Sequence, residues 1–348
     1  MTDPSEPIGV AVLGYGLAGQ VFHAPLVAAT PDLALKAIVS SRPEAVRADW
    51  PEVEVLPDLD TALARDDIRL IVIATPDALH APQAKAALAA GRHVVVDKPF
   101  ALTLAEAEDV AAAARGAPGL LAVFQNRRWD ADFLTLRRLI DEGALGEVVQ
   151  FESHYDRFRP TVVDRWKEKP GAGVWQDLGP HLVDQALQLF GPPLGVYADL
   201  AGQKPGAPVA DYAHVLLRYE RLRVILHAGQ IVHDPSLRYV VHGTGGSFIK
   251  HGLDAQEGQS KAGLRPGAAD WGVDPSPGVL ARQTEGGGVV RAPVAPERGD
   301  YPRFYAELRD AIRSGSEPPV TADQALMVMR VLDAGHRSAA ERREVPFA

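Results

Sequence analysis

The feature that most restricts the fold of this 348-residue sequence is a glycine-rich turn close to its start. Ile8–Leu13 is a short apolar run rich in β-branched residues, and the spacing G-x-G-x-x-G follows it directly at Gly14–Gly19. Such a run is typical of a strand that is buried on both faces of a parallel sheet. The segment Leu17–Ala29 is helical in pattern, so the chain is predicted to begin with a strand, a tight turn and a helix.

Each glycine of this turn has a physical reason to be a glycine. The first permits the tight turn, the second lets a pyrophosphate approach the backbone, and the third lets the helix pack closely on the strand. The free N–H groups and partial positive charge at the helix N-terminus then favour phosphate. A plain turn is the alternative, but the flanking elements favour dinucleotide binding. The predicted contacts are Gly14, Gly16, Leu17, Ala18 and Gly19.

The end of the second predicted strand, Leu33–Val39, indicates which dinucleotide is bound. An acidic side chain there binds the ribose 2′-hydroxyl of NAD, whereas an arginine accommodates the 2′-phosphate of NADP. Here Ser40, Ser41 and Arg42 follow the strand, and no acidic residue precedes Glu44. Hydroxyl groups and a guanidinium suit a phosphate monoester. The sequence therefore favours NADP, with NAD as the second choice; the alternative is that Arg42 is a solvated loop residue.

Strands and helices continue to alternate through the first 125 residues. Further strands are predicted at Leu70–Ala74, His93–Val96 and Leu120–Phe124. This alternation predicts a Rossmann-type, doubly wound parallel sheet, in which ligands bind at the carboxyl ends of the strands. Thr75 and Pro76 follow one of these strands, and Asp97 and Lys98 follow the next. All four residues are therefore expected at the cofactor site.

The second half of the chain has a different pattern. Strands are predicted at Asp211–Tyr219, Leu222–Gln230, Arg238–His242 and Ser247–Lys250, and helices at Asp177–Phe190, Tyr301–Arg313 and Thr321–Arg342. The stretch 262–300 is rich in Gly and Pro and is expected to be mostly irregular. We therefore expect a dinucleotide-binding domain at residues 1–125 and an α/β domain with an open, mostly antiparallel sheet at residues 126–348.

Apolar residues occur on both faces of the predicted strands in this second domain. Leu222, Val224, Leu226 and Ala228 share the face toward the core, whereas Ile225 lies on the opposite face beside Arg223 and His227. Leu216 likewise lies opposite Val215 and Leu217. An open sheet with an apolar outer face tends to be covered by a partner. The sequence predicts a homodimer or homotetramer that assembles through this sheet.

Two places supply groups for hydride-transfer chemistry, which needs an acid/base and a group that stabilises a developing oxyanion. Lys98 follows a strand at the cofactor site, and Asp177, His181 and Asp184 share one face of a helix. His181 is the best general acid/base candidate, because a nearby carboxylate orients an imidazole. The alternative, that Asp177 caps the helix and His181 is a packed core residue, is equally compatible with the spacing. Asp177 and His181 lack a third metal ligand at a spacing typical of metal sites, so no metal site is predicted.

Weaker candidates for contacts with a polar substrate lie near these groups in the sequence. They are His154, Tyr155, Arg157, Arg159, Trp166 and Trp175. Aromatic faces and arginine donors would suit a polyol ring, although each of these residues is equally suited to packing or to the surface.

The composition excludes several classes of function. The formal net charge is -9, which argues against a nucleic-acid or membrane partner. There is no cysteine, so thiolate catalysis and cysteine zinc sites are excluded. The first residues lack a secretory pattern, and a soluble, cytoplasmic protein is expected by default.

Several stretches together resemble the Gfo/Idh/MocA oxidoreductases, over nearly the whole chain. They are Gly14–Gly19, Ala74–His80, Asp97–Pro99 and Gly171–Asp184. Three more resemble the NADP-type branch related to scyllo-inositol dehydrogenase: Phe22–Pro25, Phe124–Asp130 and Gly252–Glu257.

This resemblance implies roles for named residues. The catalytic lysine, aspartate and histidine of the family fall on Lys98, Asp177 and His181, and His80 joins the cofactor-binding set. Asp97 departs from the family, which usually has Glu before Lys-Pro, so its contact to the cofactor is expected to differ. The implied activity interconverts a secondary alcohol and a ketone on a cyclitol, sugar or related polyol. A cofactor-binding regulator without turnover and a reductase of another small carbonyl compound remain as alternatives.

Overall fold

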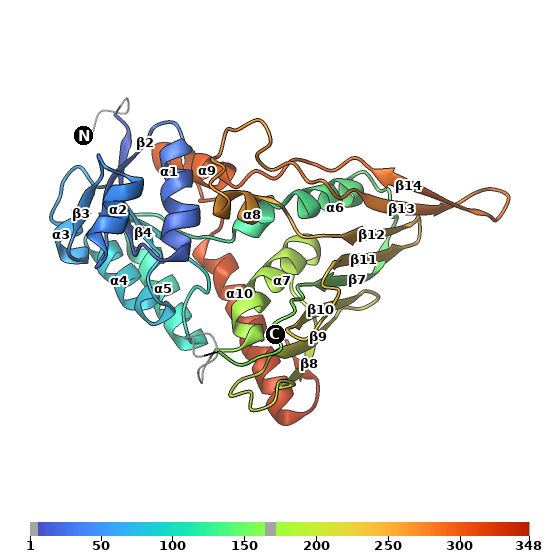
Figure 1. Ribbon diagram of the computed structural model, residues 1–348. Helices are drawn as coiled ribbons and strands as arrows, with labels where there is room; N and C mark the ends of the chain where they lie inside the picture. Colours follow the sequence, from blue (N-terminus) through green and yellow to red (C-terminus); the bar gives the residue numbers. More distant parts are fainter. Residues whose placement is uncertain (1–5, 164–171, 348) are drawn as a thin grey trace. The chain divides into compact units, whose positions relative to one another are not determined.

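The computed structural model describes residues 6–163 and 172–347, and the chain divides into two compact units (Figure 1). The first unit comprises Met1–Trp129, Gln256–Trp271 and Asp300–Leu326. The second comprises Asp130–Ala255, Gly272–Gly299 and Met327–Ala348.

The first unit contains a six-stranded parallel sheet in the order β3-β2-β1-β4-β5-β6. Its strands are β1 (Ile8–Leu13), β2 (Leu33–Val39), β3 (Glu54–Leu56), β4 (Leu70–Ile73), β5 (His93–Val96) and β6 (Leu121–Val123). β1 and β4 are buried along their whole length, as the apolar runs predict. This strand order is that of a Rossmann fold, so the predicted doubly wound sheet is confirmed.

Helices connect these strands. They are the π-helical turn η1 (Ala18–His23), α1 (Ala24–Ala29), α2 (Pro43–Asp49), α3 (Leu59–Leu63), the 3₁₀ turn η2 (Asp77–Leu79), α4 (His80–Ala89) and α5 (Leu104–Gly116). The single helix predicted after the glycine turn is therefore split into η1 and α1. Pro25 explains the split, because it has no N–H to donate, and the backbone N–H of Ala24 donates instead to the carbonyl of Gly19, five residues earlier.

Two later segments of the chain complete the first unit. They contain α8 (Gln256–Lys261) and α9 (Pro302–Ser314). The first segment itself ends with a short 3₁₀ turn, η3 (Asn126–Trp129). Phe304 of α9 packs edge-on against Phe124 with ring centroids 4.9 Å apart, and Thr321 forms a backbone bridge with Ala122. The first unit therefore includes segments from the second half of the chain, whose buried aromatic residues pack beside β6.

The second unit contains a nine-stranded sheet in the order β14-β13-β12-β11-β7-β10-β9-β8-β15. The strands are β7 (Val148–His154), β8 (Gly195–Ala201), β9 (Tyr212–Arg218), β10 (Arg223–Gly229), β11 (Leu237–Gly243), β12 (Ser247–His251), β13 (Gly278–Gln283), β14 (Val289–Val294) and β15 (Val345–Pro346). Only β7 and β10 pair in parallel, so the mostly antiparallel sheet is confirmed. β13 and β14 form a hairpin inside the stretch that the sequence predicts to be mostly irregular.

Side chains alternate between the two faces of this sheet. Val224 and Leu226 are fully buried on the inner face, and Ile225 is half-buried on the outer face. The helices of this unit are α6 (Ala131–Asp141), α7 (Val174–Phe190) and the later part of α10 (Ala322–Glu341). α7 contacts β9 and β10 from the inner face (Figure 1). Within residues 6–163 and 172–347, none of the helices has both the length and the apolar character that crossing a membrane requires.

Candidate functional site

The turn that joins β1 to η1 has the geometry that its glycines predict. Gly14 has φ +94°, and a Cβ there would lie 2.5 Å from the carbonyl oxygen of Ala74. A Cβ on Gly19 would lie 2.1 Å from the carbonyl oxygen of Gly14, so the helix packs directly on the turn. Gly16 is exposed, and a Cβ there would meet no atom within 4 Å. A cofactor pyrophosphate can therefore approach the backbone at Gly16 without displacing protein atoms.

The segment after β2 is joined to this turn. The Arg42 guanidinium donates a hydrogen bond to the carbonyl of Tyr15, and the Arg42 backbone N–H donates to Ser40 Oγ at 3.0 Å. Ser41 and Arg42 are exposed, and Ser40 is half-buried. Thus the residues predicted to select the cofactor lie beside the glycine turn at the carboxyl edge of the sheet.

His80 links the loops that follow β4 and β5. Its Nε2 lies 3.0 Å from the carbonyl oxygen of Thr75, and its Nδ1 lies 2.8 Å from the carbonyl oxygen of Pro99. The ring is buried, so both nitrogens are engaged by the protein backbone. His80 therefore positions these loops, and a direct contact of its side chain with a cofactor stays a prediction.

Asp97 and Lys98 follow β5 and rest on a buried polar chain. Asp97 Oδ1 accepts a hydrogen bond from the backbone N–H of Lys98 at 2.8 Å and lies 3.7 Å from His23 Nε2. His23 Nδ1 in turn shares a hydrogen bond of 2.6 Å with the Tyr305 hydroxyl. Burial raises the pKa of Asp97, but His23 and the cationic Lys98 outweigh it and hold that pKa below its ordinary value. The aspartate that replaces the usual glutamate is therefore held as an anion under the Lys98 loop.

The start of α7 is set by Gly173. This residue has φ +113°, a Cβ on it would lie 3.0 Å from the carbonyl oxygen of Ala210, and the N–H of Val174 donates to that same carbonyl at 2.8 Å. The helix therefore begins at Val174, three residues before the predicted start, and Gly173 is its N-cap. Asp177 is thus inside the first turn and does not cap the helix, which removes one part of the alternative reading.

Asp177 and His181 have partners from the end of β7. Arg157 Nη1 lies 3.8 Å from Asp177 Oδ2, and the Tyr155 ring stacks on the His181 ring with centroids 6.1 Å apart and 24° between the planes. Arg157 also lies over the Tyr155 ring, 5.3 Å from its centroid. His181 and Tyr155 are buried, while Asp177 is half-buried. A cation and an aromatic face therefore support the acidic and the basic group on this helix.

A buried arginine fixes the other end of this helix face. Arg238 of β11 donates to Asp132 Oδ2 at 2.9 Å, to Ser153 Oγ at 3.0 Å and to Gln185 Oε1 of α7 at 2.7 Å. Burial opposes the charged form of Arg238, but Tyr239 and Asp132 outweigh it and raise the pKa of the guanidinium. No local sequence pattern predicts this network, because its members lie up to 106 positions apart.

The weaker sequence candidates separate into groups. Trp175 is a core residue, since its indole N–H donates to the carbonyl of Leu332 at 3.2 Å. His154 lies on the outer face of the sheet, and Arg159 is exposed. Trp166 and Gly171 lie outside the described residues. Gln176, which the sequence did not single out, has a buried amide nitrogen with no hydrogen-bond partner in the described part of the chain.

Both halves of the chain are similar to known oxidoreductases. Residues 8–125 match the family model described as the oxidoreductase family, NAD-binding Rossmann fold, and residues 137–347 match its C-terminal alpha/beta domain. The chain belongs to the Gfo/Idh/MocA oxidoreductase family. It is 50% identical to the uncharacterized oxidoreductase YdgJ of Escherichia coli, over 99% of this chain and 100% of YdgJ.

Two further relatives of this Gfo/Idh/MocA protein extend the comparison. The scyllo-inositol 2-dehydrogenase (NADP(+)) IolW of Bacillus subtilis is 39% identical, over 98% of this chain and 96% of IolW. The solved structure of the YPO2259 protein of Yersinia pestis is 45% identical, with a TM-score of 0.96 over 100% of this chain and 99% of that one. The expected family is therefore confirmed, whereas the substrate stays open.

Two of the stretches that resemble one branch of the family contact each other in the first unit. Arg127 forms an ion pair with Glu257 and donates to the Tyr301 hydroxyl at 3.0 Å. Burial raises the pKa of Glu257, but Arg127 and Lys261 outweigh it and lower that pKa to about 2. These residues act as a structural connection between η3 and α8.

Proposed function

We propose that this Gfo/Idh/MocA oxidoreductase is an NADP-preferring dehydrogenase or reductase that interconverts a secondary alcohol and a ketone on a cyclitol, sugar or related polyol. The observation that carries the proposal is the polar face of α7, where Asp177 and His181 are supported by Arg157 and Tyr155. A buried helix face with an acid, an imidazole and a nearby cation suits proton transfer to a small polar substrate. The similarity to IolW, a scyllo-inositol 2-dehydrogenase, supports the substrate class.

NADP is the proposed cofactor, held by the loops at the carboxyl edge of the first sheet. The proposed contacts are Gly14, Gly16, Leu17, Ala18, Gly19, Ser40, Ser41, Arg42, Thr75, Pro76, His80, Asp97 and Lys98. Support comes from the open approach at Gly16 and from the exposed guanidinium of Arg42 next to the turn. IolW, whose name specifies NADP(+), supports the same preference.

Fluorescence titration with NADPH and NADH tests this preference. We expect NADPH to bind more tightly, and Arg42→Ala to weaken NADPH by about 10–100-fold, since hydrogen bonds to charged groups contribute about 1.5–3 kcal/mol. Binding of NADH should change little in the same variant. The preference is wrong if the wild type binds NADH at least as tightly as NADPH.

The catalytic roles follow the chemistry of the groups. The bound cofactor supplies the hydride donor or acceptor. His181 gives or takes the hydroxyl proton, because an imidazole exchanges a proton near neutral pH. Lys98 supplies a cation for the oxygen that gains negative charge, and Asp177, paired with Arg157, orients the imidazole.

Substitution of His181 tests the proton transfer. His181→Ala should lower turnover by about 10²–10⁴-fold, the usual contribution of positioned proton transfer, with NADPH affinity nearly unchanged. Lys98→Ala should lower turnover and also reduce cofactor affinity. If His181→Ala kept near-normal turnover on the true substrate, Lys98 would become the leading proton donor.

A screen of cyclitols, aldoses and sugar alcohols with NADP separates this proposal from its rivals. Turnover on members of this set supports a polyol oxidoreductase. Tight cofactor binding with no turnover on any of them would favour a regulator of the same fold. Turnover restricted to other carbonyl compounds would instead indicate a different reductase.

We also propose that a second copy of the chain covers the outer face of the nine-stranded sheet, giving a homodimer or a homotetramer. Apolar side chains lie in register on either side of Glu152 and remain partly exposed: Tyr197, Leu216 and Ile225 on one side, and Val240, Ile249 and Val279 on the other. A row of this kind is suited to a self-complementary interface. Light scattering at micromolar concentration should show an oligomer, and a monomer would contradict the proposal. A cytoplasmic location and the boundary between residues 125 and 126 stay predictions.

A further inference from the structure

Three histidines lie side by side on the outer face of the nine-stranded sheet. His227 of β10 pairs in register with His154 of β7 on one side and with His214 of β9 on the other. The ring centroids of His227 and His154 are 5.1 Å apart, and those of His227 and His214 are 5.9 Å apart. All three rings are half-buried. Neighbouring strands therefore present imidazoles at one place on this face.

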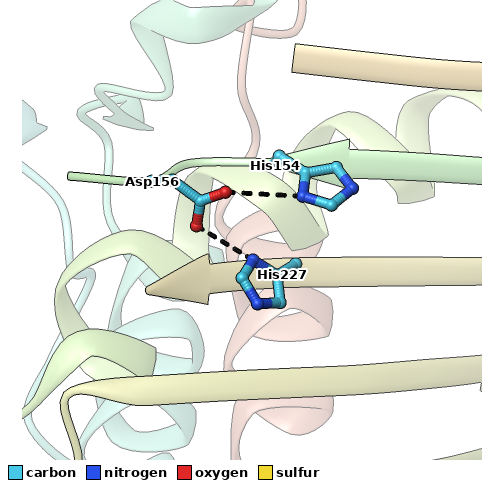
Figure 2. Close-up of side chains that lie close together, drawn as sticks. All are labelled: His154, Asp156 and His227. Atoms are coloured by element: carbon cyan, nitrogen blue, oxygen red, sulfur yellow. Dashed lines mark hydrogen bonds and ion pairs between the residues drawn. The ribbon is translucent and has the colours of Figure 1, made fainter. Parts of the chain in front are cut away.

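A buried carboxylate joins two of these rings, as Figure 2 shows. Asp156 follows the end of β7, and its Oδ1 lies 2.9 Å from His227 Nδ1 while its Oδ2 lies 3.5 Å from His154 Nδ1. One possible ligand atom from each of the three residues lies within 4.8 Å of the others. Two imidazole nitrogens and one carboxylate oxygen thus lie close enough together to be candidate ligands of one ion.

We propose that His154, Asp156 and His227 bind a divalent transition-metal ion, with Zn²⁺ as the probe. Imidazole and carboxylate ligands suit zinc and its neighbours in the first transition row. At metal–ligand distances of about 2.0–2.1 Å, tetrahedral ligand atoms are separated by about 3.3 Å. Each carboxylate oxygen of Asp156 lies near this distance from one imidazole nitrogen, Oδ1 at 2.9 Å from His227 and Oδ2 at 3.5 Å from His154. Two protein nitrogens and one oxygen leave a fourth position for water or for His214.

The groups around this cluster have the arrangement found behind metal ligands. Glu152 Oε2 lies 3.4 Å from His154 Nε2, so the far nitrogen of that ring faces a carboxylate. The backbone N–H of Gly229 donates to Asp156 Oδ1 at 2.8 Å and fixes the carboxylate.

A cluster held only by hydrogen bonds is the rival explanation, and one distance bears on the choice. His227 Nδ1 and Asp156 Oδ1 are at ordinary hydrogen-bond distance. The 3.5 Å between His154 Nδ1 and Asp156 Oδ2 is longer than the roughly 2.7–3.2 Å that is usual for an N–H···O bond. The same 3.5 Å fits two ligands of one ion. The His154 distance is therefore compatible with a shared ion, and titration with the metal decides between the two explanations.

The experiment uses the full chain without a histidine tag, treated with a chelator and exchanged into chelator-free buffer. Isothermal titration with ZnCl₂ should show one ion bound per chain, and Co²⁺ should give the visible absorption of a four-coordinate site with nitrogen and oxygen ligands. Zn²⁺ at about a hundredfold excess over its Kd should raise the Tm by about 5–10 °C. Neither readout depends on catalysis, so failure here leaves the proposed function untouched.

Variants decide whether the ion binds at this cluster. His154→Gln and His227→Gln each remove a proposed ligand and should lower Zn²⁺ affinity by more than about 10–100-fold, the usual effect of losing a residue that hydrogen-bonds a ligand. Glu152→Gln changes such a residue and should lower Zn²⁺ affinity by about tenfold. His242→Gln is the matched control, since His242 is a half-buried histidine on the outer face that hydrogen-bonds Ser247 instead. It should bind as the wild type does.

Two outcomes would overturn the site: no stoichiometric binding by the wild type, or binding that is unchanged in both histidine variants. Circular dichroism establishes that each variant is folded. If the histidine variants fail to fold, the test compares Glu152→Gln with His242→Gln. Equal Zn²⁺ affinity in these two variants would refute the site.

Discussion

Gly14 and Gly16 lie two residues apart in the same turn, yet their replacement by alanine should affect stability differently. Both replacements should weaken NADPH binding, but for different reasons. At Gly14, an added methyl group meets two obstacles. The backbone has φ +94°, and the new Cβ would lie 2.5 Å from the carbonyl oxygen of Ala74. At Gly16 the added Cβ meets no atom within 4 Å, and φ lies outside the left-handed region.

The sizes of the two effects follow from these geometries. A side chain forced into left-handed backbone costs about 1–2 kcal/mol, and overpacking costs about 1–3 kcal/mol. Gly14→Ala should therefore lose about 2–5 kcal/mol of folding free energy, or roughly 4–20 °C in Tm for a unit of this size. Gly16→Ala should be neutral or gain about 0.4–1 kcal/mol, because alanine restricts the unfolded chain. Its methyl group would nevertheless occupy the place where the pyrophosphate approaches.

Differential scanning calorimetry and NADPH titration on the two variants separate these effects. Gly16→Ala should keep the wild-type Tm and bind NADPH at least about tenfold more weakly, which corresponds to about 1.4 kcal/mol. Gly14→Ala should lose both properties. The reasoning is refuted if Gly16→Ala binds NADPH as the wild type does, or if Gly14→Ala melts at the wild-type temperature.

Three further predictions concern buried polar groups. Tyr305→Phe leaves His23 Nδ1 without its hydroxyl partner and should cost about 1–3 kcal/mol in urea unfolding; an unchanged midpoint would show that the chain to Asp97 is unimportant for stability. Arg238→Met leaves the buried carboxylate of Asp132 without its cation and should lower the free energy of unfolding by about 3–5 kcal/mol. Adding Asp132→Leu should restore part of that loss, and a double variant whose effects are purely additive would contradict this. Glu257 has its pKa lowered from 4.5 to about 2 in the folded chain, so its stabilising effect is complete above pH 4.5 and is lost as the pH falls toward 2. The stability difference between the wild type and Glu257→Gln should therefore shrink over that acid range, and a constant difference would be inconsistent with the ion pair to Arg127.

Local sequence signals account for most of the first unit. The Thr-x-x-Glu spacing at Thr103 and Glu106 forms a capping box with both of its hydrogen bonds, and this motif needs only neighbours along the chain. The apolar runs of β1 and β4 were predicted because both faces of those strands are buried. The three-residue strand β3 was not predicted, since only one of its residues is buried and it carries no apolar run.

The candidate site could be predicted only in part. The spacing of Asp177 and His181 on one helix face needs nothing but helical periodicity. Their supports are different in kind, because Tyr155 and Arg157 come from a separate segment that follows β7. The chain behind Asp97 is likewise distant in sequence, since Tyr305 lies 282 positions from His23. No local pattern specifies which of many arginines and tyrosines will meet a given helix, so these contacts required the structure.

Four consecutive residues, from His154 at the end of β7 to Arg157 just after it, serve both faces of the second sheet. Tyr155 and Arg157 face α7, where they contact His181 and Asp177, while His154 and Asp156 face outward toward His227. Backbone bonds hold the whole stretch, because the N–H of Tyr155 donates to the carbonyl of His227 at 2.9 Å and that of Arg157 donates to the carbonyl of Gly229 at 2.8 Å. Since strand side chains alternate between faces, an ion held on the outer face would restrain the same backbone that positions the inner pair. A change in this stretch that moves the backbone is thus expected to affect both faces, whereas one that alters a single side chain should affect one.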